Sequence, residues 1–170
     1  MSGLTDAQRA QLLLDCWWSH DGQWFLKARA ALGVEMAMEL NETTIESMGR
    51  VEMRRLHMAL GAPPVLEAAD LMPLVVEAHT LVGIPAEGEM DGADAFLVRV
   101  EACRVWEMTT AAGLEDLAPG CRGSLRRRHG WATAFFAAER VEWTRVLGRP
   151  DGDPRCAYRF RLLEGPISSD

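Results

Sequence analysis

The sequence predicts an α+β fold, in which an N-terminal helical half packs on a small antiparallel sheet of about three strands with interspersed helices. Apolar residues recur at intervals of three and four over residues 34–60, as on one face of a helix. Residues 96–103, 139–147 and 155–163 instead alternate with the period of two that is typical of strands. A length of 170 residues suits one hydrophobic core, so we expect a single domain spanning residues 1–170.

The first half of the chain carries the signals of long helices. Thr5, followed three residues later by glutamine, has the form of a capping box, so a helix should begin there and run toward Gly33. Ser19, Asp21 and Gly22 could interrupt it, because short polar side chains and glycine compete with helical hydrogen bonding. The sequence is therefore compatible with one kinked helix and with two abutting helices.

Shorter helices and strands alternate in the second half. We expect one or two helices over residues 65–82 and a turn-rich connection over 83–94. A helix over 105–112 follows the first strand, and another begins after a loop at 119–123. The last two strands flank residues 148–154, whose Gly, Pro and Asp content predicts an antiparallel hairpin.

Composition argues against two classes of partner. The formal net charge of -7 disfavours nucleic acid and anionic membranes, and the one basic run, Arg126 to Arg128, is too short to reverse this. No apolar stretch near the N-terminus is long enough for a signal peptide or a membrane span. We therefore expect a cytoplasmic protein whose four cysteines are reduced.

A candidate catalytic group lies in the first predicted helix. Trp17, His20, Asp21 and Trp24 are spaced by three, four and seven positions, so a continuous helix places them on one face. His20 and Asp21 could provide acid-base catalysis, and the indoles of Trp17 and Trp24 could wall a substrate pocket. The alternative is that the indoles anchor the core while the other two residues cap backbone groups at a helix break.

Two polar residues fall on the apolar stripe of the second helix. Asn41 and Glu52 lie where an apolar side chain could be buried at a lower cost in free energy. Burying a polar group without a partner costs about 1–3 kcal/mol. Each should therefore have a partner or face a cavity that binds substrate. If the stripe is narrow, both residues simply lie on its edge.

Three cysteines stand at predicted element boundaries. Cys103, Cys121 and Cys156 could converge and, with His20 or His129, bind zinc or iron. Cys121 is also the best candidate for a nucleophilic thiolate, because the helix start that follows it could lower its pKa. None of these cysteines belongs to a C-x-x-C pair, so small, buried, inert thiols are the alternative.

Several segments resemble a known family. They are residues 16–18, 20–21, 24–25, 33–35 and 39–41, followed by Cys103, 113–114, Cys121 and 156–160. This pattern is similar to an uncharacterised bacterial family related to the L-2-amino-thiazoline-4-carboxylic acid hydrolases, and more weakly to the four-vinyl-reductase small-ligand module. The first resemblance implies a protein that acts on or binds a small heterocyclic or amino-acid-like molecule, and the second implies an apolar ligand pocket.

These features lead to three functional hypotheses. The first is a small-molecule enzyme that hydrolyses a C-N or C-S bond in a small ring or amide, with His20, Asp21 and Cys121 as its catalytic residues. The second is a non-catalytic sensor domain that binds a small ligand or a metal in the same cavity. The third is a helical interaction protein without a pocket, which would show an exposed apolar patch and a filled interior.

Overall fold

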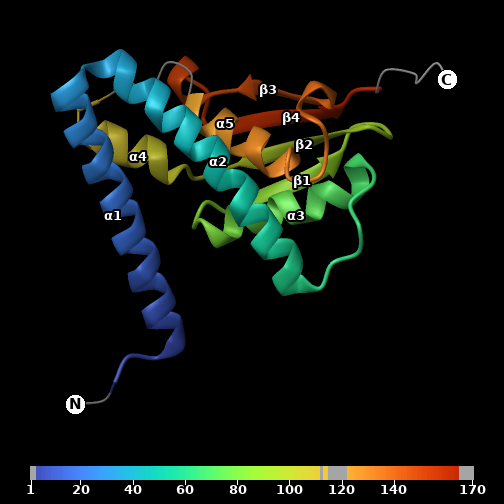
Figure 1. Ribbon diagram of the computed structural model, residues 1–170, viewed down its shortest axis with the longest axis horizontal. Helices are drawn as coiled ribbons and strands as arrows, with labels where there is room; N and C mark the ends of the chain where they lie inside the picture. The colour runs from blue at the N-terminus through green and yellow to red at the C-terminus, as the bar shows by residue number, and fades with distance from the viewer. Residues whose placement is uncertain (1–2, 112, 115–121, 165–170) are drawn as a thin grey trace. The chain divides into compact units, whose positions relative to one another are not determined.

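A computed structural model describes residues 3–111, 113–114 and 122–164 of the chain and confirms the α+β class. The elements, labelled in Figure 1, are α1 (Asp6–Leu32), α2 (Val34–Leu60), α3 (Ala68–Leu81), β1 (Ala86–Met90), β2 (Ala95–Val100), α4 (Arg104–Ala111), α5 (Arg122–Ala132), β3 (Val141–Leu147) and β4 (Cys156–Leu162). The chain divides into two compact units, Met1–Asn41 and Glu42–Asp170. The expectation of a single domain stays a prediction.

The first unit contains α1 and the beginning of α2. The predicted capping box is present, because Thr5 and Gln8 exchange hydrogen bonds at the N-terminus of α1. The helix is continuous, which decides between the two alternatives left open by the sequence. Ser19 stays within it by donating its hydroxyl to the carbonyl oxygen of Asp15 at 2.8 Å. The helix ends at Gly33, whose φ of 82° suits glycine.

The second unit is built around a four-stranded antiparallel sheet in the order β1-β2-β4-β3 (Figure 1). The predicted strand near residue 96 and the predicted C-terminal hairpin are both confirmed as β2, β3 and β4. The fourth strand, β1, lies where we expected only a turn-rich connection. Gly88 at its centre makes the sequence resemble a turn, and a Cβ there would lie 2.8 Å from a methyl carbon of Val76 in α3. Glycine therefore lets β1 approach the helix.

The two faces of the sheet differ in chemistry. Gly88, Val98 and Tyr158 lie opposite one another in neighbouring strands and so share a face. Gly88 packs against α3, and Tyr158 lies under the guanidinium of Arg128 in α5, so both helices cover this face. Ion pairs on the opposite face join Arg99 to Glu89, Arg159 to Asp91 and Arg161 to Glu142 at 2.7, 2.8 and 3.8 Å.

Aromatic residues fill one end of the covered face. Phe96 and Phe160 stack with their ring centroids 4.8 Å apart, and Trp143 meets Phe96 edge to face at 5.6 Å. Phe96 and Phe160 are both fully buried. Tyr158, the next residue of β4 on this face, lies under the guanidinium of Arg128.

Candidate functional site

The structure does not enclose the four residues proposed for the first helix. His20 is exposed, Trp24 is 40% exposed, and Trp17 and Asp21 are half-buried. The buried indole of α1 is instead that of Trp18. The continuous helix brings the four residues to one face as predicted, but two of them face solvent, as pocket walls would not. Their catalytic and substrate-binding roles stay a prediction.

The buried face of α2 differs from the predicted stripe. Met48, one of the apolar residues spaced by three and four over residues 34–60, is 40% exposed, whereas Met53 is fully buried. Glu52 lies on the side of the helix that meets α5, where it accepts hydrogen bonds from the guanidinium of Arg127 and from Nε1 of Trp131 at 3.0 Å. Glu52 therefore has the partner that its position required. Asn41 is half-buried at the end of the first unit, and its proposed contact with substrate stays a prediction.

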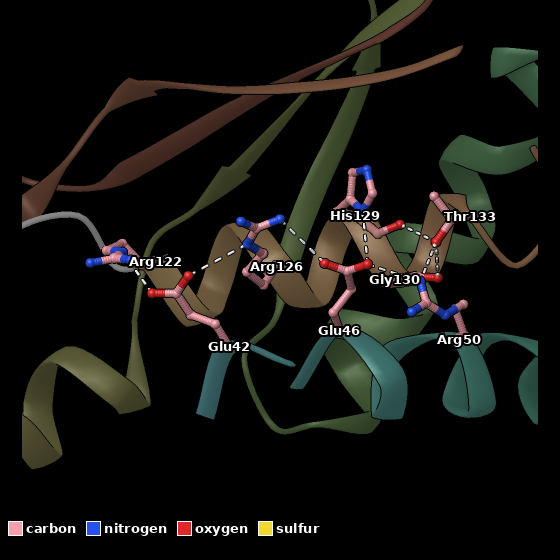
Figure 2. A network of polar contacts seen from close by, with 8 residues as sticks. All are labelled: Glu42, Glu46, Arg50, Arg122, Arg126, His129, Gly130 and Thr133. Atoms are coloured by element: carbon pink, nitrogen blue, oxygen red, sulfur yellow. Dashed lines mark hydrogen bonds and ion pairs between the residues drawn. The ribbon is translucent and has the colours of Figure 1, made fainter. Parts of the chain in front are cut away.

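Acidic side chains of α2 meet basic side chains of α5 in a polar network. Glu42, only 7% exposed, lies 2.6 Å from Arg122 and 3.5 Å from Arg126. Figure 2 shows Glu46 between Arg126 and His129, each at 3.4 Å. The predicted apolar stripe was wrong in this region because α5 supplies partners that make inward-facing carboxylates acceptable.

The backbones of α2 and α5 touch where two glycines cross. A Cβ added to Gly49 would lie 2.5 Å from the carbonyl oxygen of Arg127, and one added to Gly130 would collide with the carbonyl oxygen of Glu46. No side chain separates the helices at this point. If α5 moves, the backbone of α2 over residues 42–60 must therefore move with it.

A second polar group lies between α3, α5 and β4, and we call it the interior cluster: His79, Arg128, Trp131 and Tyr158. Nδ1 of His79 lies 2.8 Å from the carbonyl oxygen of Val75, which can only accept, so Nδ1 carries the proton. Nε2 is then the acceptor for Nη2 of Arg128, at 2.7 Å. The geometry thus assigns a neutral imidazole with one defined tautomer.

Aromatic rings enclose this pair. The ring of Trp131 meets His79 edge to face with 4.7 Å between centroids, and the guanidinium carbon of Arg128 lies 3.6 Å from the centre of the Tyr158 ring. Arg128 is 4% exposed, and each of the other three is 1% exposed. Arginine and histidine are rarely buried to this extent. The cluster is therefore a candidate for binding as well as for structure.

Burial and charge both act on His79. Removal from water is the largest cause that lowers the pKa of its imidazole, and the positive charge of Arg128 lowers that pKa further. The hydrogen bond to Val75 opposes these effects without reversing them. The imidazole is therefore neutral at neutral pH, in agreement with its hydrogen bonds.

Two of the three proposed metal-binding cysteines lie beside the interior cluster. Cys103 and Cys156 are buried free thiols, and a thiolate at Cys103 would interact electrostatically with Cys156 and with Arg128. Burial is the main cause that raises the pKa of Cys103, which favours an inert thiol. Cys121, the proposed nucleophile, lies outside the described residues. Among the residues that the structure describes, no group of three or more His, Cys, Asp or Glu side chains could hold a metal ion.

Sequence reasoning missed the interior cluster, although one signal for it was present. His79 continues the apolar stripe of α3, formed by Ala68, Leu71, Val75 and Ala78. A titratable side chain on such a stripe needs a polar partner. Arg128 could not be found in this way, because it lies in a basic run that resembles a solvated surface.

Comparison with protein families gives one match that spans most of the chain. The model of DUF6125, described as a family of unknown function, matches residues 8–162. The chain belongs to the DUF6125 family. Comparison with curated proteins gives no match. This DUF6125 chain also has no helix, among its described residues, with the length and apolar character needed to cross a membrane.

Solved structures with the same fold exist despite low sequence identity. One is the phenol-responsive sensory domain of the transcription activator PoxR with phenol, at a TM-score of 0.63 and 14% identity, covering 83% of this chain and 72% of that one. Another is the trafficking protein particle complex subunit 3 from Naegleria fowleri covalently bound to palmitic acid, at a TM-score of 0.50 and 16% identity, covering 92% and 96%. At these identities the likeness concerns the fold.

Proposed function

We propose that this DUF6125 chain is a small-ligand sensor domain, and that the interior cluster recognises a ligand with an aromatic or apolar body. The observation that carries the proposal is the convergence of His79, Arg128, Trp131 and Tyr158 at no more than 4% exposure. Ligand sites of this kind combine apolar and aromatic walls with a few polar groups that fix orientation. The cluster offers two rings, a donor and a neutral imidazole.

The similar structures support this proposal. The PoxR sensory domain holds phenol, and the trafficking subunit is bound to palmitic acid, so two proteins with this fold hold molecules with apolar bodies. The hydrolase hypothesis gains no comparable support, because neither of these structures is described as a hydrolase and the family has no assigned function. Hydrolysis by His20, Asp21 and Cys121 stays an untested prediction.

A closed cluster also suits a sensor. Because its four side chains are nearly fully buried, a ligand must displace packed groups to reach them, so binding selects a rearranged state. Trp131 joins the cluster to Glu52 of α2, and the Gly49–Gly130 crossing lies on the same two helices. Occupancy of the cluster would therefore change the position of α5 against α2.

The proposal is tested by measuring the melting temperature and calorimetric binding with phenol and with palmitate. A ligand at 100 times its Kd should stabilise the fold by about 2.7 kcal/mol. His79→Gln should lose this effect, whereas His20→Gln, which alters the exposed histidine of α1, should retain it. If the wild-type protein binds neither probe and no other small aromatic molecule, or if only His20→Gln abolishes binding, the proposal fails.

A further inference from the structure

The charge of Arg128 restricts which ligands suit the interior cluster. A guanidinium stays protonated in proteins at all ordinary pH values, so Arg128 places a permanent positive charge in a site that is 4% exposed. A lysine in the same place could lose its proton, and arginine cannot. Any molecule that enters the cluster therefore meets a cation at close range.

One donor of Arg128 faces a neutral acceptor. Nη1 donates to the carbonyl oxygen of Ser124 at 2.9 Å and to its hydroxyl at 2.8 Å. Nη2 donates to Nε2 of His79, a neutral nitrogen. A hydrogen bond to an anionic oxygen is about twice as strong as one to a neutral acceptor. An incoming anion would thus compete with His79 for Nη2.

The aromatic rings define where the body of such a ligand would lie. Tyr158 covers one face of the guanidinium, so the N–H groups of Arg128 point outward in its plane, the direction from which an oxygen must approach. Trp131 lies beside His79 and presents a flat apolar surface. An oxygen near Nη2 would therefore belong to a molecule whose ring packs against these side chains.

We propose that the ligand is a small aromatic anion, an aryl carboxylate or a phenolate, whose charged oxygen accepts a hydrogen bond from Nη2 of Arg128. This inference rests on the proposed function, because it names the ligand class of the interior cluster. A neutral phenol would bind differently, by donating its O–H to Nε2 of His79. The two modes differ in whether binding depends on ligand charge.

Two pairs of probes separate charge from shape. Benzoate and benzamide have the same ring and similar size, but only benzoate is charged at pH 7.5, and calorimetry should give benzoate at least a tenfold lower Kd. Phenol is largely neutral at this pH, whereas 4-nitrophenol ionises near neutrality and absorbs visible light as the anion. Bound 4-nitrophenol should be more ionised than free 4-nitrophenol at the same pH.

Variants on one helix provide the control. Arg128→Met should abolish the preference for benzoate over benzamide, whereas Arg126→Met, which alters an exposed arginine of α5, should retain it. Circular dichroism checks the fold of each variant. If Arg128→Met does not fold, Arg128→Gln removes the charge while keeping a polar side chain, and it should likewise abolish the preference for benzoate.

The outcomes separate this inference from the function on which it rests. If benzamide and phenol bind as tightly as benzoate, and bound 4-nitrophenol is no more ionised than the free compound, the ligand is not an anion, while the sensor function stands. If neither phenol nor palmitate nor any of these aromatic probes binds, the sensor function itself fails. A benzoate preference that survives Arg128→Met with an intact fold would overturn the role of Arg128.

Discussion

Nη2 of Arg128 lies 2.7 Å from Nε2 of His79, and this contact joins α5 to α3 inside the second unit. The two side chains are 49 positions apart in the sequence and both are buried. Nδ1 of the imidazole donates its proton to the carbonyl oxygen of Val75, so the contact with Arg128 exists only while Nε2 is unprotonated. This contact thus depends on the protonation state of one histidine, and its contribution to the stability of the fold can be measured.

Stability should fall on acidification because of His79. The pKa of this imidazole is lowered in the folded protein from its ordinary value of 6.5, so below that pH the unfolded chain binds the proton more readily. The contribution of His79 to the free energy of unfolding is complete above pH 6.5. It is lost as the pH falls toward the lowered pKa, by up to about 1.4 kcal/mol per pH unit. Urea unfolding between pH 7.5 and pH 5 measures it.

Comparison with one variant isolates this effect from other titrations. His79→Gln removes the titrating group and should flatten the pH dependence of stability relative to wild type. If the difference between wild type and His79→Gln is the same at pH 7.5 and at pH 5, the imidazole does not titrate as its burial predicts.

The helix crossing predicts a destabilising effect of alanine. Alanine in place of glycine within a helix normally stabilises by about 1 kcal/mol. At Gly130 or Gly49 the new methyl group would meet a backbone carbonyl oxygen, and such overpacking costs about 1–3 kcal/mol or more. Chemical denaturation should therefore show a net loss of unfolding free energy for Gly130→Ala and for Gly49→Ala. Gly3→Ala, with open space around it, should have no effect, and a gain in stability at Gly130 would contradict the crossing.

Removing the carboxylate of Glu52 should cost more than removing a surface carboxylate. Glu52→Gln removes a carboxylate from the guanidinium of Arg127, which is 11% exposed, and breaking such a pair costs about 3 kcal/mol. Glu142→Gln affects a 3.8 Å pair on the open face of the sheet and should cost less than about 1 kcal/mol. If urea unfolding shows equal losses of unfolding free energy for the two variants, Glu52 does not pair with Arg127 and Trp131.

The thiols should differ in reactivity. Cys16 is exposed and should react with iodoacetamide in the native protein, whereas Cys103 and Cys156 should react only after unfolding. Peptide mapping by mass spectrometry assigns each site. A metal would also protect these thiols, so the labelling is repeated with a chelator and the protein is analysed for zinc and iron. Faster labelling of Cys103 and Cys156 with chelator would revive the metal hypothesis.

Local signals in the sequence were sufficient for most of the fold. The capping box at Thr5, the apolar period of residues 34–60 and the alternation around residues 148–154 each depend on neighbours within a few positions, and the structure contains the helices and the hairpin that they predict. The strand β1 was missed because Gly88 is explained only by α3, which approaches it in space.

The interior cluster could not be predicted because it depends on contacts between distant segments. Whether Glu52 faces solvent or Arg127 is decided by the position of α5, and the same holds for Arg128 within its basic run. His20 and Trp24 have the right spacing for a site, yet their exposure is set by what surrounds α1 rather than by spacing. Spacing predicts which residues share a face, and it does not predict what covers that face.

The central claim is that the group of His79 and Arg128 binds a ligand, and calorimetric titration of the full chain with benzoate and phenol tests it most directly. We expect saturable binding to the wild-type protein, with phenol weakened at least tenfold in His79→Gln, benzoate weakened at least tenfold in Arg128→Met, and both unchanged in His20→Gln. Phenol binding of equal strength in wild type and His79→Gln together with benzoate binding of equal strength in wild type and Arg128→Met, or no binding to the wild type, would contradict the claim.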